Sequence, residues 1–337
     1  MEQFSFVSAK SEAQAAEAAA RSATAQMGAS VRYVAGGTNL VDLLKLDVER
    51  PKQVVDINAL ELAKIEPVNN GELRGGLRIG ALARNSDVAN DARVKRDYAV
   101  LSEAILSGAS PQIRNMASTA GNLLQRTRCP YFRDLAHKCN KREPGSGCDA
   151  MEGHNRMLAI LGTSEHCIAT NPSDQNVALM ALEAVVEIRG KSGSRNVPIA
   201  EFYKLPGTTP HIKTVLEPGD LITAVRLPAP VAGAKSGYLK LRDRAAYEFA
   251  LASAAIVLGV SGGKVTHARV ALGGVGTIPW RAREAEAELM GKPATREQFV
   301  RAAEAALKDA KPRSENGFKV ELAKRCIVHA LTTVNVA

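Results

Sequence analysis

Four of the five cysteines in this 337-residue chain fall within one stretch, and this clustering constrains the fold more than any other feature of the sequence. They are Cys129, Cys139, Cys148 and Cys167, separated by nine, eight and eighteen residues. A disulfide framework typically belongs to a smaller secreted domain and spreads its bridges along the chain. Four clustered cysteines in a chain of this length indicate metal ligands instead. The fifth, Cys326, lies among apolar residues of a predicted helix, so we expect an ordinary buried thiol there.

The spacing does not decide which metal these cysteines bind. It differs from the C-x-x-C pairing of most zinc ribbons, and four thiolates supplied by a loop can hold zinc or an iron–sulfur cluster. Spacing alone favours zinc over a cluster, and a cluster over disulfides. Lys138, Lys141 and Arg142 surround Cys139, and we expect their positive charge to favour the thiolate form that binds metal. Three nearby histidines are alternative ligands: His137, His154 and His166.

A glycine turn near the N-terminus, VAGGTNL over residues 34–40, has the features of a phosphate site. The adjacent Gly36 and Gly37 allow the backbone to approach a ligand closely and leave N–H groups free. A helix predicted over 40–46 would add partial positive charge at its N-terminus. The segment is neither G-x-G-x-x-G nor a Walker A loop. On the motif alone, a tight strand-to-helix turn explains the glycines equally well.

A second segment of small residues, SPQIRNMASTAGNLLQ over 110–125, follows later in the chain. Taken alone it would be a loop between strands, but as a second cradle it suits an extended ligand with two ends. Asn122 within it can donate or accept a hydrogen bond. Further on, Asp174 precedes an apolar helix. Its carboxylate either stabilises the first helical turn or accepts hydrogen bonds from a ligand hydroxyl.

The first two thirds of the chain alternate between strand and helix patterns. We expect a β-α-β-α-β opening with strands over 4–7, 31–34 and 54–57. Gly28 should end the first helix, and Asn85, Ser86 and Asp87 are cap candidates. The remaining predicted elements before the linker are a strand over 73–82, a helix over 98–106 and strands over 183–189 and 221–227.

A linker over 228–237, PAPVAGAKSG, marks a change in composition. Beyond it we expect strands, or a strand and a helix, over 238–241 and 249–260, and a strand over 265–275. Pro279 should start a helix, and two more helices are predicted over 295–309 and 321–332.

The composition excludes several functional classes. Hydrophobic residues make up 45% and charged residues 23%, as in ordinary soluble proteins. Aromatic residues, at 4%, are too few for a protein that stacks bases of single-stranded nucleic acid. The net charge of +9 comes from scattered Lys and Arg, which indicates a solvated surface, so we expect no nucleic-acid partner. We find no signal peptide, and the longest apolar run, over 249–260, is too short for a membrane span of about 20 residues.

The motifs together resemble those of the FAD-binding medium subunits of the xanthine dehydrogenase family of molybdenum hydroxylases. VAGGTNL, IRNMASTAGNL and the PSD that ends at Asp174 follow the order and spacing of that family, and the tail from Gly237 resembles its C-terminal domain. The cysteine insertion is similar to that of the family's periplasmic aldehyde oxidoreductases, whose FAD subunit carries an additional [4Fe–4S] cluster. One departure is Ala120, where many relatives have glycine. A methyl group is tolerable there only if the backbone angle is ordinary.

The resemblance implies an α+β fold with α/β-type layers. A two-lobed FAD-binding domain of the PCMH/vanillyl-alcohol-oxidase type would span 1–228, with lobe one over about 1–58 and lobe two over about 59–228. The cysteine-rich insertion would occupy 126–168. A C-terminal α/β domain like that of CO dehydrogenase flavoproteins would span 236–337.

The resemblance also implies roles for particular residues. The cluster ligands would be Cys129, Cys139, Cys148 and Cys167. The first FAD-binding segment, whose last six residues would wrap the pyrophosphate, would comprise Val34, Ala35, Gly36, Gly37, Thr38, Asn39 and Leu40. The second side would be lined by Ala109, Ile113, Ala117, Ser118, Gly121 and Asn122. Asp174 would bind the polar part of the dinucleotide. Ile222 would pack near the ring, and Lys240 would approach the flavin.

The implied function is electron transfer within an oxidoreductase complex, an expected heterotrimer. A large subunit with a molybdenum cofactor would oxidise an aldehyde to a carboxylic acid. Electrons would pass through [2Fe–2S] centres of a small subunit to FAD on this chain, and then to an external acceptor. No catalytic residue is expected here, because the flavin performs the chemistry. The complex would be periplasmic if a partner carries an export signal, and cytoplasmic otherwise.

Two alternatives belong to other classes. A zinc-stapled interaction module would explain the cysteines but not two glycine cradles in tandem. A self-contained flavin oxidoreductase would bind its own substrate, but the glycine motifs have no candidate base beside them.

Overall fold

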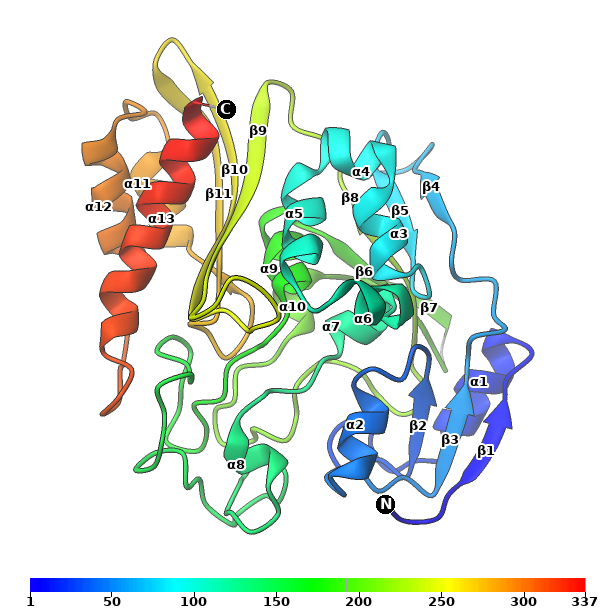
Figure 1. Ribbon diagram of the computed structural model, residues 1–337. Helices are drawn as coiled ribbons and strands as arrows, with labels where there is room; N and C mark the ends of the chain where they lie inside the picture. Colours follow the sequence, from blue (N-terminus) through cyan, green and yellow to red (C-terminus); the bar gives the residue numbers. More distant parts are fainter. Residues whose placement is uncertain (192, 337) are drawn as a thin grey trace.

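A computed structural model describes residues 1–191 and 193–336, and within these residues the strands form three sheets (Figure 1). The N-terminal sheet is parallel, and its strands in spatial order are β1 (Ser5–Ser8), β3 (Gln53–Asp56) and β2 (Val31–Val34). Two helices belong to this part, α1 (Glu12–Ala19) and α2 (Leu40–Lys45). The strand–turn–helix from β2 to α2 places VAGGTNL at the C-terminal edge of the sheet, as its pattern predicts.

A five-stranded antiparallel sheet forms the middle of the molecule. Its strands in spatial order are β4 (Ile65–Pro67), β5 (Leu77–Gly80), β8 (Leu221–Leu227), β6 (Val185–Gly190) and β7 (Gly193–Pro198). The associated helices are α3 (Asn85–Asn90), α4 (Ala92–Asp97), α5 (Ala99–Ser107), α6 (Pro111–Met116), α7 (Thr119–Leu123), α9 (Asp174–Ala181) and α10 (Ile199–Phe202).

The C-terminal sheet lies between two layers of helices (Figure 1). Its antiparallel strands are β9 (Ala234–Leu241), β10 (Ala252–Ser261), β11 (Lys264–Gly273) and β12 (Trp280–Arg281). On one side lie α11 (Arg283–Leu289), α12 (Arg296–Ala306) and α13 (Phe318–Val336), and on the other lie α5 and α9. Because both faces of β10 are covered, its side chains are apolar without alternation, which explains the long apolar run in the sequence.

Helix α9 is buried along its whole length, from Asp174 to Ala181. It contacts α5 and α7 as well as β10 and β11, so it joins the middle of the molecule to the C-terminal sheet. A helix with this many neighbours must place its polar first turn in the interior too. Asp174 is therefore a buried carboxylate, 9% exposed, which needs partners inside the protein.

The cysteine-rich insertion is mostly irregular and contains one short helix, α8 (Pro130–Arg133). It has a small core of its own, which includes Phe132 and Leu158 and packs against Leu43 of α2. The insertion is also attached to the segment before α13 by two hydrogen bonds. The Asn155 backbone N–H donates to a carboxylate oxygen of Glu315 at 2.9 Å, and the Glu315 backbone N–H donates to Asn155 Oδ1 at 3.0 Å.

Some predicted boundaries were wrong. The first helix ends at Ala19 rather than near Gly28, because the Ser22 hydroxyl bonds to the backbone of Thr24 and Ser30 and turns the chain. The second small-residue segment forms two short helices, α6 and α7, rather than a loop.

Two further expectations about helix starts also failed. No helix starts at Pro279, because Trp280 and Arg281 pair with β11 and the helix begins only at Arg283. The cap candidates at the start of α3 lie inside the helix, whose N-cap is Arg84.

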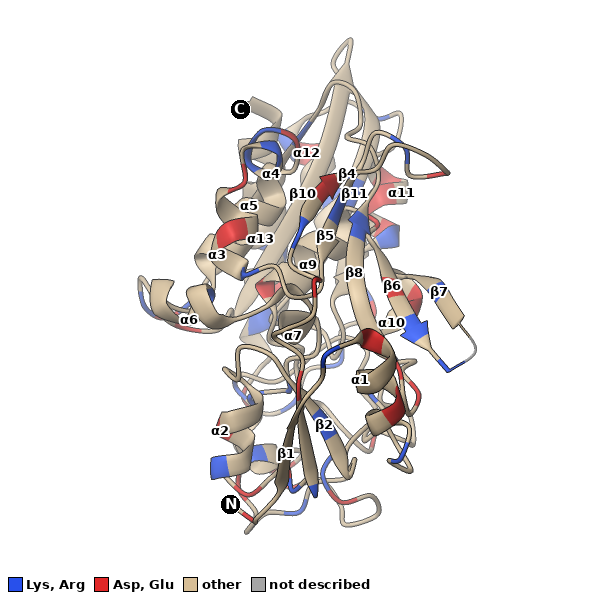
Figure 2. Cartoon of the chain, turned by 90° about the vertical axis from the view of Figure 1, so that its right-hand side faces the viewer, with Lys and Arg blue, Asp and Glu red and all other residues tan. Residues whose placement is uncertain are grey.

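The surface carries mixed charge, with Lys and Arg interleaved with Asp and Glu in the view of Figure 2. One example is Glu187 of β6, which pairs with Arg78 and Arg226 on neighbouring strands. Within the described part of the chain, no helix combines the length and apolarity that a bilayer span requires.

The buried Lys319 at the start of α13 should make the stability of the protein depend on pH. Its side chain is fully buried and donates to the carbonyl oxygens of Leu158 and Gly274 at 3.1 and 2.7 Å. Burial, and then the charge of Arg156, lowers the pKa of Lys319 to about 7. Above pH 7 the folded chain has lost a proton that an unfolded lysine keeps up to a pKa of about 10.4, so stability rises with pH.

We therefore expect the free energy of unfolding to rise more steeply from pH 7 to 9 in the wild type than in Lys319→Met, by up to about 1.4 kcal/mol per pH unit. Urea unfolding of both proteins at both pH values measures this. Comparing the two proteins cancels other titrating groups. Equal slopes would show that Lys319 keeps its proton in the folded chain.

Candidate functional site

The first glycine segment lines a cavity of about 210 Å³ between β2, α7 and the loop before β8. A second cavity, of about 560 Å³, lies between α5, α6, α9 and β9. The two cavities share three lining residues, Thr38, Asn39 and Gly121, so they are adjacent.

All sixteen residues implied as cofactor-binding line one cavity or the other. In the first cavity lie Val34, Ala35, Gly36, Gly37, Thr38, Asn39, Leu40, Ser118, Gly121 and Ile222. In the second lie Thr38, Asn39, Ala109, Ile113, Ala117, Gly121, Asn122, Asp174 and Lys240. Segments distant in the sequence thus converge on two adjacent cavities, as a two-headed ligand would require.

The two glycine segments touch at Gly36. A Cβ atom built there would lie 1.8 Å from the carbonyl oxygen of Met116, at the end of α6. Gly37 has a φ of 72°, in the left-handed region that favours glycine. Gly36 therefore allows the close approach of two backbones, and Gly37 allows the tight turn.

The first glycine segment leaves backbone donors unused. Among the described residues, the five consecutive backbone N–H groups from Gly36 to Leu40 have no hydrogen-bond acceptor. Successive free N–H groups at a turn form a concave anion-binding surface. The five residues line the first cavity, so the loop fits a phosphate or pyrophosphate group.

Local capping shapes the second segment. The Ser118 hydroxyl accepts a hydrogen bond from the Gly121 N–H at 3.2 Å and begins α7. Ala120 lies within this helix without a positive φ, so its methyl group is compatible with the backbone. Ala109, in contrast, has a φ of 52°, which costs a residue with a side chain about 1–2 kcal/mol. The strain falls on a residue that lines the second cavity.

A buried polar network holds α7 between α3 and α9. Asn122 donates to Asn85 Oδ1 at 2.9 Å, and Asn85 donates to Gln175 Oε1 at 2.8 Å. Ser173 donates to Asn122 Oδ1 at 2.6 Å while it caps α9. Sequence reasoning missed Asn85 and Gln175. The available signal was polar side chains within segments that are otherwise apolar or small.

Asp174 is held by two residues of β9. Its Oδ1 accepts a hydrogen bond from the Tyr238 hydroxyl at 2.6 Å, and its Oδ2 pairs with Lys240 Nζ at 2.8 Å. Lys240 also donates to the Ser107 carbonyl at 3.1 Å. Burial, and then the negative charge of Asp174, raises the pKa of Tyr238 well above its usual value, so the phenol stays a donor.

Both interpretations of Asp174 stay compatible with this arrangement. Asp174 lies in the first turn of α9, as predicted, where its charge favours the helix, and Ser173 is the cap. Each carboxylate oxygen retains a lone pair for a donor from the cavity. Removal of either charged partner would leave the other buried and unpaired, at a cost of about 3–5 kcal/mol.

The four clustered cysteines come together in the core of the insertion, where three are buried and Cys148 is partly buried. Cys139 and Cys148 form an isolated antiparallel bridge through their backbones. All five cysteines are free thiols. Among the described residues, however, no group of three or more His, Cys, Asp or Glu side chains is placed to hold a metal ion.

Burial outweighs the expected effect of nearby positive charge: Arg142 lowers the pKa of Cys139, as expected, but the net shift is upward. Burial raises the pKa of Cys129 to about 12 and that of Cys148 to about 11, and it also raises the pKa of Cys139. The basic side chains point elsewhere: Arg142 donates to the carbonyls of Tyr131, Phe132 and His137, and Lys141 to that of Pro210. Two of the histidines pair with carboxylates instead: His137 with Asp149 and His154 with Glu315.

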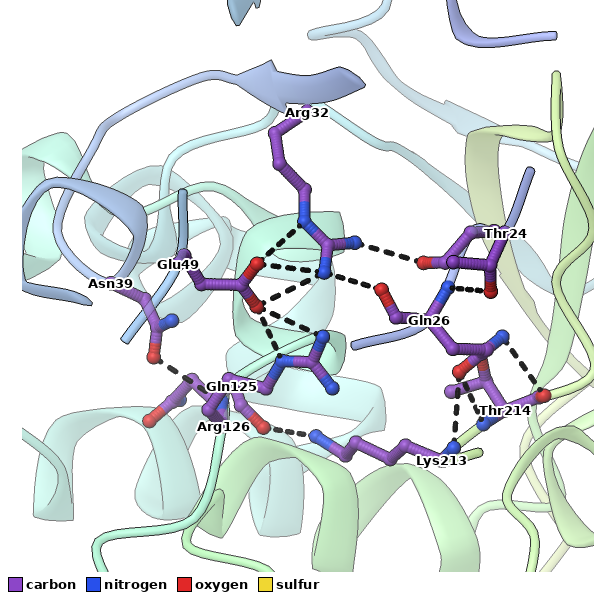
Figure 3. Close-up of polar contacts among 10 residues, drawn as sticks. Thr24, Gln26, Arg32, Asn39, Glu49, Gln125, Arg126, Lys213 and Thr214 are labelled. Atoms are coloured by element: carbon purple, nitrogen blue, oxygen red, sulfur yellow. Dashed lines mark hydrogen bonds and ion pairs between the residues drawn. The ribbon is translucent and has the colours of Figure 1, made fainter. Parts of the chain in front are cut away.

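Sequence reasoning also missed a buried charge cluster at the first cavity (Figure 3). Glu49, 3% exposed, accepts hydrogen bonds from Arg32 Nη2 at 2.8 Å and Arg126 Nη2 at 3.0 Å. Burial alone would raise the pKa of Glu49, but Arg126 and Arg32 hold it below its usual value. The backbone N–H of Arg126 also donates to Asn39 Oδ1 at 3.2 Å, which ties the cluster to the glycine segment.

Comparison with known families divides the chain into two matched parts. Residues 2–230 match the family described as the FAD binding domain in molybdopterin dehydrogenase. Residues 237–334 match the CO dehydrogenase flavoprotein C-terminal domain.

Relatives match over most of the chain. The aldehyde oxidoreductase FAD-binding subunit PaoB of Escherichia coli (strain K12) is 52% identical over 310 residues, 91% of this chain and 92% of the relative. The glyceraldehyde dehydrogenase medium chain of Sulfolobus acidocaldarius is 30% identical over 264 residues, 78% of this chain and 74% of the relative.

A solved structure supports the same fold. It is carbon monoxide dehydrogenase from Hydrogenophaga pseudoflava, in a form that lacks the Mo-pyranopterin moiety of the molybdenum cofactor. The TM-score is 0.76 at 26% identity, over 99% of this chain and 98% of that chain. The expected mixed fold, an FAD-binding domain followed by a CO dehydrogenase flavoprotein C-terminal domain, is confirmed.

The contact between the two glycine segments can be tested by adding a methyl group at residue 36. Gly36→Ala would place a methyl group against the Met116 carbonyl, so one segment must move. We expect the free energy of unfolding to fall by about 1–3 kcal/mol, the usual cost of overpacking. Denaturant unfolding measures it. Gly317→Ala is the control, because a Cβ there meets nothing within 4 Å. Equal stability of the two variants would contradict the close approach.

Proposed function

We propose that this chain, which belongs to the family of FAD-binding subunits of the molybdenum hydroxylases, is the electron-transfer subunit of a molybdenum-dependent aldehyde oxidoreductase. The family membership makes it a subunit of an oxidoreductase. The aldehyde as substrate is the further step, and the 52% identity to an aldehyde oxidoreductase subunit supports it.

The observation that carries the proposal is the convergence of two glycine segments, Asp174 and Lys240 on two adjacent cavities. An extended dinucleotide needs two compartments and a polar link between them. The free N–H groups from Gly36 to Leu40 lie at the first compartment and would hold the pyrophosphate. The larger second compartment has room for the flavin ring.

Within this site the chain's own residues bind and orient. The polar network through Asn85 and Asn122 fixes the second segment against α9. The Asp174 carboxylate, held by Tyr238 and Lys240, presents acceptors to the second cavity, and Ile222 offers an apolar wall to the first. Bound FAD would supply the redox chemistry, since a flavin accepts electrons one at a time and releases them to an acceptor.

The reaction of the whole complex would divide among its subunits. Oxidation of an aldehyde with water to a carboxylic acid releases two electrons and two protons. A large subunit with a molybdenum cofactor would perform this step, and [2Fe–2S] centres of a small subunit would carry the electrons. This chain would pass them to an external acceptor.

We propose that the four clustered cysteines bind a [4Fe–4S] cluster. Three of them lie in one small core, and Cys148 packs against it. Four cysteine thiolates are the usual ligands of a [4Fe–4S] cluster, although they also suit a single zinc ion. The resemblance of the insertion to that of aldehyde oxidoreductases whose FAD subunit carries such a cluster favours the cluster.

Cofactor content tests the proposal directly. We expect the anaerobically purified chain to contain one FAD and, because a [4Fe–4S] cluster has four irons, about four iron atoms with acid-labile sulfide. Visible spectroscopy with iron, sulfide and zinc assays measures this. Zinc in place of iron would overturn the cluster and leave the FAD subunit. Absence of flavin would favour a zinc-stapled interaction module.

Activity separates the subunit from a self-contained flavin enzyme. We expect the isolated chain to oxidise no aldehyde, while the complex with its partners reduces an artificial acceptor when aldehyde is added. Steady-state assays of both preparations measure this. Aldehyde turnover by the isolated chain would contradict the proposed division of labour.

The role of the cluster can be tested at Cys139, which is buried in the insertion core. We expect Cys139→Ser to lose the cluster and, if the cluster relays electrons, to lower turnover of the complex at least tenfold while FAD content stays at one per chain. Cys326→Ser is the matched control, because this buried thiol lies in α13, outside the insertion. Normal turnover without the cluster would leave it a structural role.

A further inference from the structure

Three basic side chains that line the first cavity, Arg32, Arg126 and Lys213, lie around Glu49 and Gln125 (Figure 3), and we call this part of the lining the base of the cavity. Arg32 is fully engaged: it binds Glu49 and the backbone carbonyls of Ala25 and Gln26. Arg126 uses Nε and Nη2 on Glu49, and its Nη1 has no partner among the described residues. The side chain of Lys213 makes a single hydrogen bond, from its Nζ to the carbonyl oxygen of Gln125.

The base of the cavity carries more positive charge than its carboxylate can neutralise. Glu49 is shared by the two arginines, and no carboxylate of the described residues lies within ion-pair distance of Lys213. At the rim of the cavity, Asp220 is paired with Arg195, and Glu217 is exposed to solvent. A partly buried cation without a counter-ion is costly, so the base has an unmet requirement for an anion.

The surroundings of Lys213 point to the same requirement. The charged groups that face it are Arg126, Lys141 and Arg128, and the ring of Tyr203 lies 5.9 Å from its Nζ. Burial, followed by these three cations, lowers the pKa of Lys213 well below its usual value. No acidic group opposes this shift.

We propose that Arg126 and Lys213 form a cationic base that binds the phosphate groups of the dinucleotide, opposite the free N–H groups of the glycine segment. This inference rests on the proposed function, because the ligand is the proposed FAD. The backbone bond from Arg126 to Asn39 holds the base next to Gly36–Leu40. The ligand class is a nucleoside diphosphate, and no sequence motif marks either residue.

A consequence is that nucleotide binding takes up a proton. In the empty cavity, burial and the neighbouring cations disfavour the ammonium form of Lys213. A phosphate group brings negative charge and favours the ammonium form. The fraction of Lys213 that is neutral in the empty cavity would take its proton from the buffer and pair, as ammonium, with a phosphate oxygen.

The test compares ADP with adenosine on the flavin-depleted complex, by isothermal titration calorimetry. We expect Lys213→Met to weaken ADP binding about 10- to 100-fold, as loss of a charge-assisted hydrogen bond implies, and to change adenosine binding less than about twofold. Lys213→Arg should keep the preference for ADP. Lys319→Met is the matched control, because it removes another buried lysine, far from the cavity, and should change neither affinity.

Titrations in buffers of different ionisation enthalpy give the number of protons taken up. We expect up to one proton per ADP in the wild type near pH 7.5, and none in Lys213→Met or Lys213→Arg, because arginine never releases its proton. Equal losses for ADP and adenosine, or an unchanged ADP affinity in Lys213→Met, would overturn the phosphate role.

The outcomes distinguish this inference from the proposed function. If the wild type binds FAD and Lys213→Met keeps its preference for ADP over adenosine, the inference is wrong and the function stands. If the wild type binds neither FAD nor ADP, the proposed function itself fails.

Discussion

The close approach of Gly36 to the Met116 carbonyl is the constraint on which the rest of the site depends. It brings a turn of the N-terminal parallel sheet against the end of a helix that belongs to the middle sheet. Once these backbones touch, the two cavities on either side share a boundary at Thr38, Asn39 and Gly121. A side chain at residue 36 would collide with the Met116 carbonyl, so the two segments would have to move apart.

Charged side chains line both cavities of this site. In the first, Glu49 is shared by Arg32 and Arg126, Asp220 pairs with Arg195 and Glu217 is exposed, which leaves Lys213 without a carboxylate partner among the described side chains. In the second, Asp174 is paired with Lys240 and accepts a hydrogen bond from Tyr238. The lining of the second cavity also includes more arginines than carboxylates. Positive charge at both cavities suits a dinucleotide, whose phosphates lie at its centre.

Much of this could be predicted from the sequence, and the exceptions have physical causes. The motifs located the cavity-lining residues because glycines, small residues and an acidic helix start leave local signals. Asn85 and Gln175 leave only a weak signal, a polar side chain in an apolar or small segment, because their roles arise from helix packing. Lys213 leaves none, because it lies on a distant loop. Trp280 and Arg281 became a strand because pairing with β11 outweighed helical preference. The pKa values of the clustered thiols are raised rather than lowered, because burial, which the sequence does not reveal, outweighs the charge of nearby lysines and arginines.

The attachment of the insertion to the segment before α13 bears on how the protein is made. Residues 126–168 leave the ribosome well before Glu315 and Lys319, which supply their bonds to Asn155 and Leu158. Chains generally fold from the N-terminus as they emerge. The cysteine core therefore stays without the support of Glu315 and Lys319 until those residues have been made. Before then, the insertion depends on its own core and on Leu43 of α2.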